Sequence, residues 1–138
     1  MDPSETTTKA ASRPKGHRDF SWDDPGDWTY DAAQHLAYHL FGVGTDERGS
    51  VARVMIVKYD PGARVEPHYH DCDYCSIVVE GSMQITRRVH GVRSVRVVNA
   101  GTVYGPLVAG PDGCTVIDVF ATGEPGPATR AMNTYVPR

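Results

Sequence analysis

Residues 67–75, with the sequence PHYHDCDYC, bring two histidines, two aspartates and two cysteines together within nine residues. In an extended segment, His68 and His70 point to the same side because alternate side chains share a face. Two imidazoles that converge inside a barrel make up half of a site for a first-row transition metal. An isolated H-x-H pair is common in proteins, so the surrounding chain decides between a metal site, a redox pair and a polar loop.

The cysteines allow two further interpretations of this segment, and the sequence argues against both. Cys72 and Cys75 form a C-x2-C pair beside the histidines, but these four residues lie within eight positions, whereas a structural zinc site usually takes its ligands from two separated pairs. A thioredoxin-like redox pair needs a helix that begins at the first cysteine, and the segment after Cys75 is β-branched. Cys114, which opens an apolar segment, is expected to be a small buried hydrophobe.

The elements that position these residues are predicted to be β-strands. Apolar, β-branched segments recur about every 8–12 residues between clusters of Gly, Pro, Asp and Asn, which is typical of a sandwich or barrel. The expected strands span residues 33–41, 51–59, 75–89, 92–98 and 114–121. The fold class is therefore expected to be all-β.

Two of these segments carry more detailed expectations. Residues 75–89 should form two strands across a Glu-Gly turn, with Met83, Ile85 and Val89 on one face, and GPDG at 110–113 should be the turn before the last strand. Along 51–59 the side chains alternate between two faces, and one of two sets lines the barrel. The two sets are Met55, Val57 and Tyr59, and Val54, Ile56 and Lys58.

Length and composition indicate one domain with two less ordered ends. The chain has 138 residues, and after Met1 its first 19 residues contain no apolar side chain larger than alanine. Such a stretch buries too little surface to offset its ordering entropy. Residues 1–19 are therefore expected to be a disordered arm, residues 20–125 the barrel, and residues 126–138 an irregular tail. Three aromatic residues after the arm either close one mouth of the barrel or pin the arm to it: Phe20, Trp22 and Trp28.

The charge pattern argues against nucleic acid and membranes as partners. The net charge is −3 and the Lys and Arg residues are scattered, unlike the basic footprint of a nucleic-acid-binding domain. The local basic cluster is interpreted as the solvated outer face of a hairpin: Arg87, Arg88, Arg93 and Arg96. No apolar run approaches the roughly 20 residues of a membrane helix. Three cysteines, without an apolar leader, are expected to be reduced thiols of a cytoplasmic protein.

The segment around the two histidines resembles the first motif of the cupins, a superfamily of small jelly-roll β-barrels. That motif reads G-x5-H-x-H-x3-E-x6-G, and Gly62, His68, His70 and Gly81 match it in this sequence. The second motif, G-x5-P-x-G-x2-H-x3-N, is matched in part, with Gly101 at its second glycine. The resemblance implies a single-domain, RmlC-like cupin jelly roll that forms a homodimer.

Both motifs are partly degenerate at the positions that matter for chemistry. Tyr74 stands where the first motif has its glutamate ligand, and Tyr104 stands where the second has its histidine. Asn99 and Arg93 replace the proline and the first glycine of the second motif. A neutral tyrosine, with a pKa ordinarily near 10, is a poor ligand for zinc or manganese, whereas tyrosinate binds ferric iron.

Three functions stay open from these residues. In the first, His68 and His70 bind a metal together with a substitute ligand: Asp73 turned inward by a bulge, a tyrosinate, Cys72, His35 or His39. In the second, the barrel is metal-free, the histidines are general bases, and the tyrosines donate to a developing oxyanion. In the third, the barrel binds a small molecule without catalysis.

The expectation drawn from these alternatives is an enzyme that acts on a small organic molecule inside the barrel. Its chemistry is expected to be metal-dependent, of the oxygenase, isomerase, lyase or cyclase type. His68 and His70 are the predicted metal ligands, and Tyr74, Tyr104 and His70 are the predicted catalytic groups. Iron is the first choice of metal, with zinc, manganese, nickel or no metal as alternatives. The expected partners are the small molecule and a second copy of the chain.

Overall fold

The structure is a computed structural model that describes residue 16, residues 19–44 and 52–121, and the backbone of residues 129–131. Within this part the chain is all-β, as predicted, with one short 3-10 turn, η2 (Pro25–Asp27), before the strands. The strands are β1 (Thr29–Asp31), β2 (Leu36–Val43), β3 (Ala52–Tyr59), β4 (Arg64–Val65), β5 (His68–His70), β6 (Tyr74–Ile85), β7 (Arg88–His90), β8 (Val95–Val98), β9 (Leu107–Phe120) and β10 (Thr129–Ala131).

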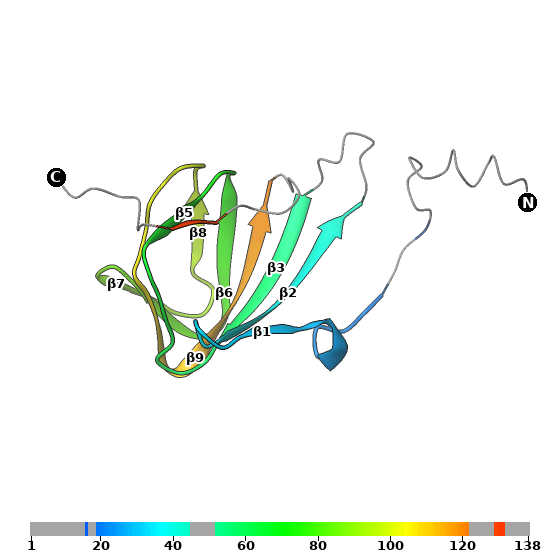
Figure 1. Cartoon of the computed structure of the whole chain (residues 1–138), viewed down its shortest axis with the longest axis horizontal. Coiled ribbons are helices and arrows are strands. Elements are labelled where there is room, and N and C mark those ends of the chain that lie inside the picture. The colour runs from blue at the N-terminus through cyan, green and yellow to red at the C-terminus, as the bar shows by residue number, and fades with distance from the viewer. Residues whose placement is uncertain (1–15, 17–18, 45–51, 122–128, 132–138) are drawn as a thin grey trace, which may run out of the picture.

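Most of the strands belong to one curved sheet with the order β1-β2-β3-β9-β6-β7. Two short strands join it off this path, since β4 pairs with β9 and β8 pairs with β6, while β5 and β10 form a second, two-stranded sheet. Figure 1 shows how the sheet curls, so that β5 and β7 lie across the interior from β2 and β3. Side chains that point into this interior form both the core and the candidate site.

The longest strands, β6 and β9, bend where two glycines meet. Gly81 and Gly113 have φ angles of +70° and +79°, and a Cβ on Gly81 would lie 2.0 Å from the carbonyl oxygen of Gly113. Only glycine accepts both the left-handed conformation and this close approach. The two predicted turns are therefore wrong: Glu80–Gly81 and residues 110–113 lie inside continuous strands, and the chain turns back only after Ile85.

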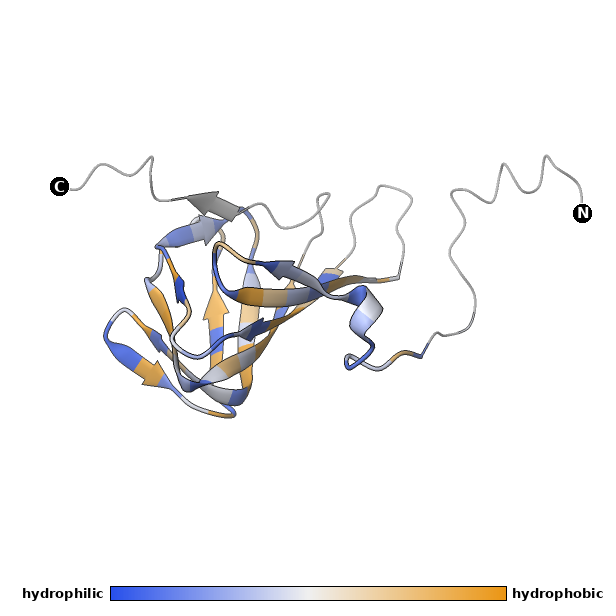
Figure 2. Cartoon of the chain, turned by 60° about the horizontal axis from the view of Figure 1, so that its bottom comes forward, coloured by the Kyte–Doolittle hydropathy of each residue, from blue (hydrophilic) through white to orange (hydrophobic). Residues whose placement is uncertain are grey.

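The apolar core fills the interior between β2, β3, β4, β6 and β9. Val57 is 2% exposed, and Met55 and Tyr59 pack against the same cluster, so this set of β3 side chains lines the barrel. The buried members of the cluster are Leu36, Val57, Ala63, Val65, Val78, Met83, Leu107, Ala109, Cys114 and Val116. Figure 2 shows the hydrophobic residues concentrated on the strands, whereas η2 is hydrophilic.

Two of the three residues predicted to share a face of the 75–89 segment contact this core. Met83 is buried in it and Ile85 packs against it, but Val89 is 66% exposed. Val89 lies on β7, beyond the turn that follows Ile85, and its side chain points outward.

The aromatic residues before β1 cover the outer face of β2. Because Tyr38 packs against the core, the adjacent His39 points to the opposite face of the strand. His39 is 6% exposed and lies 5.3–5.8 Å, between ring centroids, from Phe20, Trp28 and Phe41. Of the two interpretations of these aromatics, pinning the N-terminal segment to the barrel is the one that the contacts support.

The two predicted ends fall mostly outside the described residues. The arm at 1–19 is described only at residues 16 and 19, and in the tail at 126–138 the backbone of β10 pairs antiparallel with β5. The division into arm, barrel and tail therefore stays a prediction. Across the described ranges, no helix has the length and apolar character required to cross a membrane.

Candidate functional site

Strand β5 directs His68 and His70 into the barrel, with Tyr69 between them on the opposite face. The two histidines are 8% and 6% exposed. The loop before β9 runs beside them: the backbones of His68 and Tyr104 exchange two hydrogen bonds of 3.1 Å, and the Gly101 N–H donates to the His70 carbonyl at 2.8 Å. This pairing fixes Tyr104 opposite His68.

Tyr74, the first residue of β6, brings a fourth ring to the same place. The ring centroids lie 4.7 Å apart for His68 and Tyr104, 5.2 Å for the two histidines, and 5.1 Å for His70 and Tyr74. Fully buried Phe120 packs against both Tyr74 and His70. The structure thus places the four predicted site residues in one cluster, while their catalytic and metal-binding roles stay predictions.

His68 is held in one tautomer by two hydrogen bonds. Its Nδ1 lies 2.8 Å from the Glu66 carbonyl oxygen, and its Nε2 lies 3.0 Å from Tyr104 Oη. A carbonyl oxygen only accepts, so Nδ1 carries the proton, and Nε2 of the neutral ring accepts from the phenol. Burial lowers the pKa of His68, the bond to Glu66 opposes this, and the charge of Arg96 adds to the lowering. The ring is therefore neutral at neutral pH, with a basic nitrogen toward Tyr104.

The two phenols remain protonated at physiological pH. Burial, more than any neighbour, raises the pKa of Tyr74 to about 12, and burial together with the nearby Tyr74 raises the pKa of Tyr104 well above its usual range. The Tyr74 hydroxyl is buried and forms no hydrogen bond of normal geometry. Two neutral hydroxyl groups therefore face each other, with ring centroids 6.1 Å apart.

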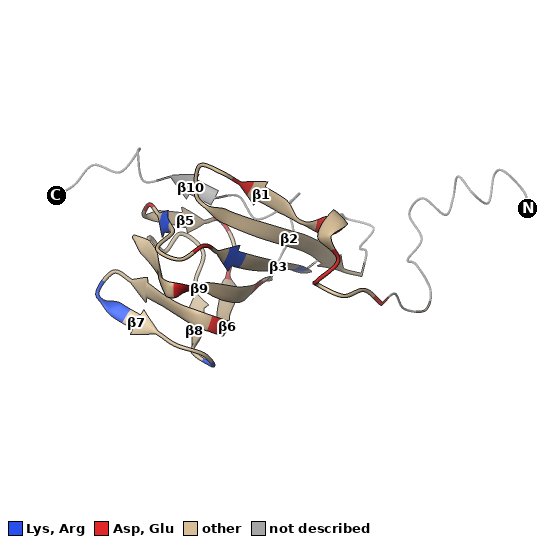
Figure 3. Ribbon diagram, turned by 90° about the horizontal axis from the view of Figure 1, so that it is seen from below, with Lys and Arg blue, Asp and Glu red and all other residues tan. Residues whose placement is uncertain are grey.

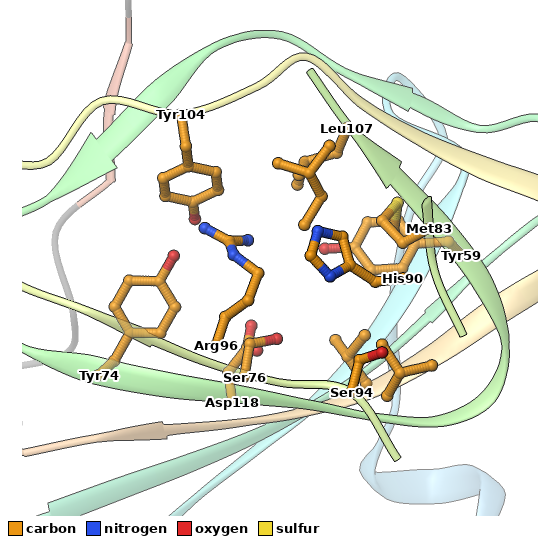
Figure 4. A pocket seen from close by; sticks show the side chains of 13 residues that line it. Tyr59, Tyr74, Ser76, Met83, His90, Ser94, Arg96, Tyr104, Leu107 and Asp118 are labelled. Atoms are coloured by element: carbon orange, nitrogen blue, oxygen red, sulfur yellow. The ribbon is translucent and has the colours of Figure 1, made fainter. Parts of the chain in front are cut away.

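The phenols form one end of a cavity inside the barrel. Its empty space, counted together with the solvent at its open mouth, is about 420 Å³. Its lining residues are Tyr59, Tyr74, Ser76, Val78, Met83, Ile85, His90, Ser94, Arg96, Tyr104, Leu107, Val116 and Asp118. Neither His68 nor His70 is among them, but each contacts a tyrosine that lines the cavity, His68 through Tyr104 and His70 through Tyr74. In Figure 4, Tyr74 and Tyr104 point toward each other with Arg96 between them, and Asp118 and Ser76 lie near the base of the Arg96 side chain.

The position of Arg96 corrects the interpretation of the basic cluster. Arg87, Arg88 and Arg93 are exposed as expected, and Figure 3 shows Lys and Arg scattered among the strands. Arg96 instead points into the cavity, with its guanidinium carbon 4.7 Å from the centroid of the Tyr104 ring. The sequence VRSVRVV is compatible with either register of β8, and the structure adopts the one that turns Arg96 inward.

Asp118 was missed by the sequence interpretation. It is 8% exposed and lines the cavity from β9. Burial raises its pKa to about 6, against the opposing effects of the Ser76 hydroxyl and the Arg96 charge. Its Oδ1 is buried without a hydrogen-bond partner. The usable signal was its spacing: Asp118 shares a strand face with the inward-pointing Val116 and Phe120.

Three of the residues considered as substitute metal ligands lie elsewhere, whereas Cys72 packs against the cluster of Tyr74, Val98 and Phe120. His35 is exposed in the turn before β2, and His39 lies on the outer face of that strand. Asp73 is exposed and accepts a hydrogen bond of 2.7 Å from the Ala100 N–H. The three cysteines form no disulfide, and Cys114 is buried as predicted.

The donor groups at the site do not fit the metal ion that the resemblance implies. Among the residues that the structure describes, no group of three His, Cys, Asp or Glu side chains is arranged to hold a metal. His68 Nε2 accepts a hydrogen bond from Tyr104, and the raised pKa values of Tyr74 and Tyr104 oppose the tyrosinate that ferric iron would need. The chemistry of the site is therefore derived from the protein's own side chains.

Comparison with known proteins places this barrel among solved cupin structures. No protein-family model matches the sequence, and no curated protein matches it either. An RmlC-like cupin from Shewanella frigidimarina matches with a TM-score of 0.57 at 22% identity, over 87% of this chain and 97% of that chain. KdgF from Halomonas sp. matches with a TM-score of 0.59 at 21% identity, over 79% and 98%.

Two further matches have other functions in their names. The polyketide cyclase RemF from Streptomyces resistomycificus matches with a TM-score of 0.55 at 19% identity, over 76% of this chain and 75% of that chain. A chain from the Rhodobacter sphaeroides complex of SigE with the anti-sigma ChrR matches with a TM-score of 0.54 at 15% identity, and this protein spans about half of that chain, 47%. At these identities the likeness establishes the fold, and the chain has the RmlC-like cupin jelly roll that its motifs predicted.

Proposed function

We propose that this protein is a metal-independent acid–base enzyme that acts on a small organic molecule in the barrel cavity. The observation that carries the proposal is the hydrogen bond between Tyr104 Oη and His68 Nε2, at the edge of the cavity. A neutral imidazole whose other nitrogen donates to a backbone carbonyl is oriented to accept a proton. This is the metal-free alternative among the functions that the sequence left open.

Proton transfer through this pair leaves Tyr104 protonated before and after the step. As Tyr104 Oη takes a proton from a carbon or hydroxyl group of the substrate, its own proton passes to His68 Nε2, and the substrate becomes an anion. The Glu66 carbonyl accepts from Nδ1 of the resulting imidazolium. Because no free tyrosinate accumulates, the raised pKa of Tyr104 is compatible with this route.

The developing negative charge has two partners in the cavity. The Arg96 guanidinium lies over the Tyr104 ring, and the buried Tyr74 hydroxyl forms no hydrogen bond of normal geometry with the described residues. Preorganised donors of this kind stabilise an enolate-like oxyanion more than they stabilise the neutral substrate. Return of the proton to a different atom gives an isomerisation, and loss of a leaving group gives an elimination. A polyketide cyclase among the structures of similar fold supports small-molecule chemistry in such a barrel.

The proposal is tested by hydrogen–deuterium exchange of small carbonyl compounds in D2O, followed by proton NMR. A panel of ketones, 1,3-dicarbonyl compounds and 2-oxo acids is incubated with the untagged protein. At least one compound should exchange its α-protons faster with the protein than without it, and a chelator should leave that rate unchanged. Tyr104→Phe should slow the exchange about 100-fold or more, the usual contribution of a positioned acid–base group.

The matched control is Tyr69→Phe, which removes a phenol from the opposite face of the same region. Tyr69→Phe should exchange at the rate of the unmodified protein. An exchange rate that Tyr104→Phe leaves unchanged would contradict the proposal. A compound that binds in the cavity but never exchanges would instead indicate a binding protein without catalysis.

The homodimer and the cytoplasmic location expected from the sequence stay proposals. The exposed valines of β8 favour a second copy as a partner, since Val95 and Val97 are 60% and 80% exposed side by side on one strand face. Sedimentation of the untagged protein decides this, and a monomer at micromolar concentration would count against it.

A further inference from the structure

Arg96 places a positive charge inside the barrel, where it interacts electrostatically with Asp118 but forms no ion pair with it. Its guanidinium contacts the Tyr104 ring, and no carboxylate of the described residues forms an ion pair with it within 4.0 Å. Asp118 lines the same cavity but lies near the base of the Arg96 side chain, as Figure 4 shows. The charged end of Arg96 is directed instead toward the two phenols.

This arrangement is unfavourable for the protein alone. Strand β8 turns Arg96 inward while Val95 and Val97 face outward, the reverse of the usual amphipathic pattern. A one-residue shift of register would bury both valines and expose Arg96, together with Val98, which is 5% exposed in this register. An arginine cannot lose its charge in a protein, and a partly buried charge is disfavoured unless it is paired. A partner that arrives with the ligand would supply the missing pairing.

We infer that the substrate is a small monocarboxylate whose carboxylate pairs with Arg96 and whose compact body contacts the apolar wall of the cavity. This inference rests on the proposed function and names the class of molecule for the same site. Arginine presents a planar fork of donors that matches the two oxygens of a carboxylate. Tyr74 provides a hydroxyl donor beside that fork, whereas the Tyr104 hydroxyl donates to His68 Nε2. The apolar wall consists of Val78, Met83, Ile85, Leu107 and Val116.

The charge balance of the cavity favours a monoanion over a phosphate. Among the described residues that line it, Arg96 is the one fixed positive charge, and Asp118 contributes negative charge whenever it is ionised. His90, the cavity residue at the end of β7, has a pKa lowered by burial and by the charges of Arg96 and Arg88, so it adds no positive charge at neutral pH. A ligand that is already a dianion when it binds would meet repulsion from Asp118 that a single guanidinium does not offset. The second charge of a deprotonated monocarboxylate develops only as His68 becomes an imidazolium.

The inference is tested by binding of matched acid and amide pairs to the untagged full chain. The probes are benzoate and benzamide, cyclohexanecarboxylate and its amide, crotonate and crotonamide, and 3-methylbutanoate and its amide. Titration calorimetry or saturation-transfer NMR at pH 7 measures each affinity. At least one acid should bind ten-fold or more tightly than its amide, because the amide has the same shape without the charge.

Variants of two arginines locate the charge that makes this difference. Arg96→Gln should abolish the preference for the acid, and Arg96→Lys, which keeps the charge without the fork, should retain part of it. Arg88→Gln, which removes the same charge from the outer surface of β7, should bind like the unmodified protein. The inference is overturned if no acid of the panel binds better than its amide, or if the preference survives in Arg96→Gln while circular dichroism shows that variant folded.

The ligand class and the proposed acid–base function can be refuted separately. If acids bind through Arg96 but Tyr104→Phe keeps its exchange rate, then the ligand class stands and the acid–base role is wrong. If Tyr104→Phe loses exchange while acids and amides bind alike, then the acid–base role stands and the ligand class is wrong.

Discussion

Strands β6 and β9 run through two halves of the barrel interior that differ in chemistry. At one half they carry Met83 and Leu107, which are buried in the apolar core. At the other half they carry Tyr74 and Asp118, each with a buried oxygen that has no hydrogen-bond partner. Unsatisfied buried polar groups lower stability, so this second half holds two groups that cost the fold stability, although Tyr74 also packs there against Phe120 and Val98.

The largest effect on stability is expected at the joint between the halves, where β6 bends. Gly81→Ala should destabilise the protein by about 4 kcal/mol, because strain at φ +70° adds to a clash of the new Cβ with the Gly113 carbonyl. Gly62→Ala is the matched control: its φ is +73° with no atom within 4 Å of the new Cβ, so it should cost about 1 kcal/mol. Chemical denaturation measures both. Equal losses would mean that the contact between the two glycines does not define the bend.

A large-to-small substitution in the apolar half should lower stability and leave ligand binding intact. Leu36→Ala removes a buried side chain that does not line the cavity, and such substitutions cost about 3 kcal/mol. Leu40→Ala, on the same strand with 38% exposure, should cost less than about 1 kcal/mol. A loss of acid binding in folded Leu36→Ala would show that the two halves are not separable.

The polar half should show the reverse behaviour at Asp118, where removing a charge stabilises the fold. Because its folded-state pKa is raised to about 6, the Asp118 carboxyl group binds its proton more tightly in the folded state than in the unfolded state. Stability is therefore lost as pH rises from the unfolded pKa, near 4, through 6. Asp118→Asn should match the unmodified protein near pH 4 and exceed it by about 3 kcal/mol above pH 7. Paired denaturation curves from pH 4 to 8 measure the difference, and a constant difference across that range would contradict the raised pKa.

The sequence predicted the fold class and the His/Tyr cluster better than the bend of β6 and the polar residues of the cavity. The motif glycines and the H-x-H pair placed His68, His70, Tyr74 and Tyr104 in one cluster, because strand alternation fixes which side chains share a face. The bend of β6 at Glu80–Gly81 was predicted as a turn because these two residues are typical of turns. Only the pairing with β9 shows that the strand continues through them.

Strand alternation alone did not give the orientation of Arg96 or the role of Asp118. In the segment 92–98, valine and arginine occur at both odd and even positions, so either strand face could point inward. The register of β8 therefore depends on its pairing with β6. Asp118 lies in an apolar strand where a lone acid has no local partner, and its importance appears only when the cavity around it is assembled.

The central claim is that His68 is a neutral base oriented toward Tyr104, and its tautomer tests this most directly. Long-range proton–nitrogen correlation NMR of protein labelled with 15N-histidine distinguishes the two ring nitrogens at pH 7.5, and loss of one signal set in His68→Gln assigns them. We expect His68 to carry its proton on Nδ1, with an Nε2 signal that shifts when Tyr104→Phe removes the hydrogen bond. A proton on Nε2, or a charged ring at that pH, would contradict the account.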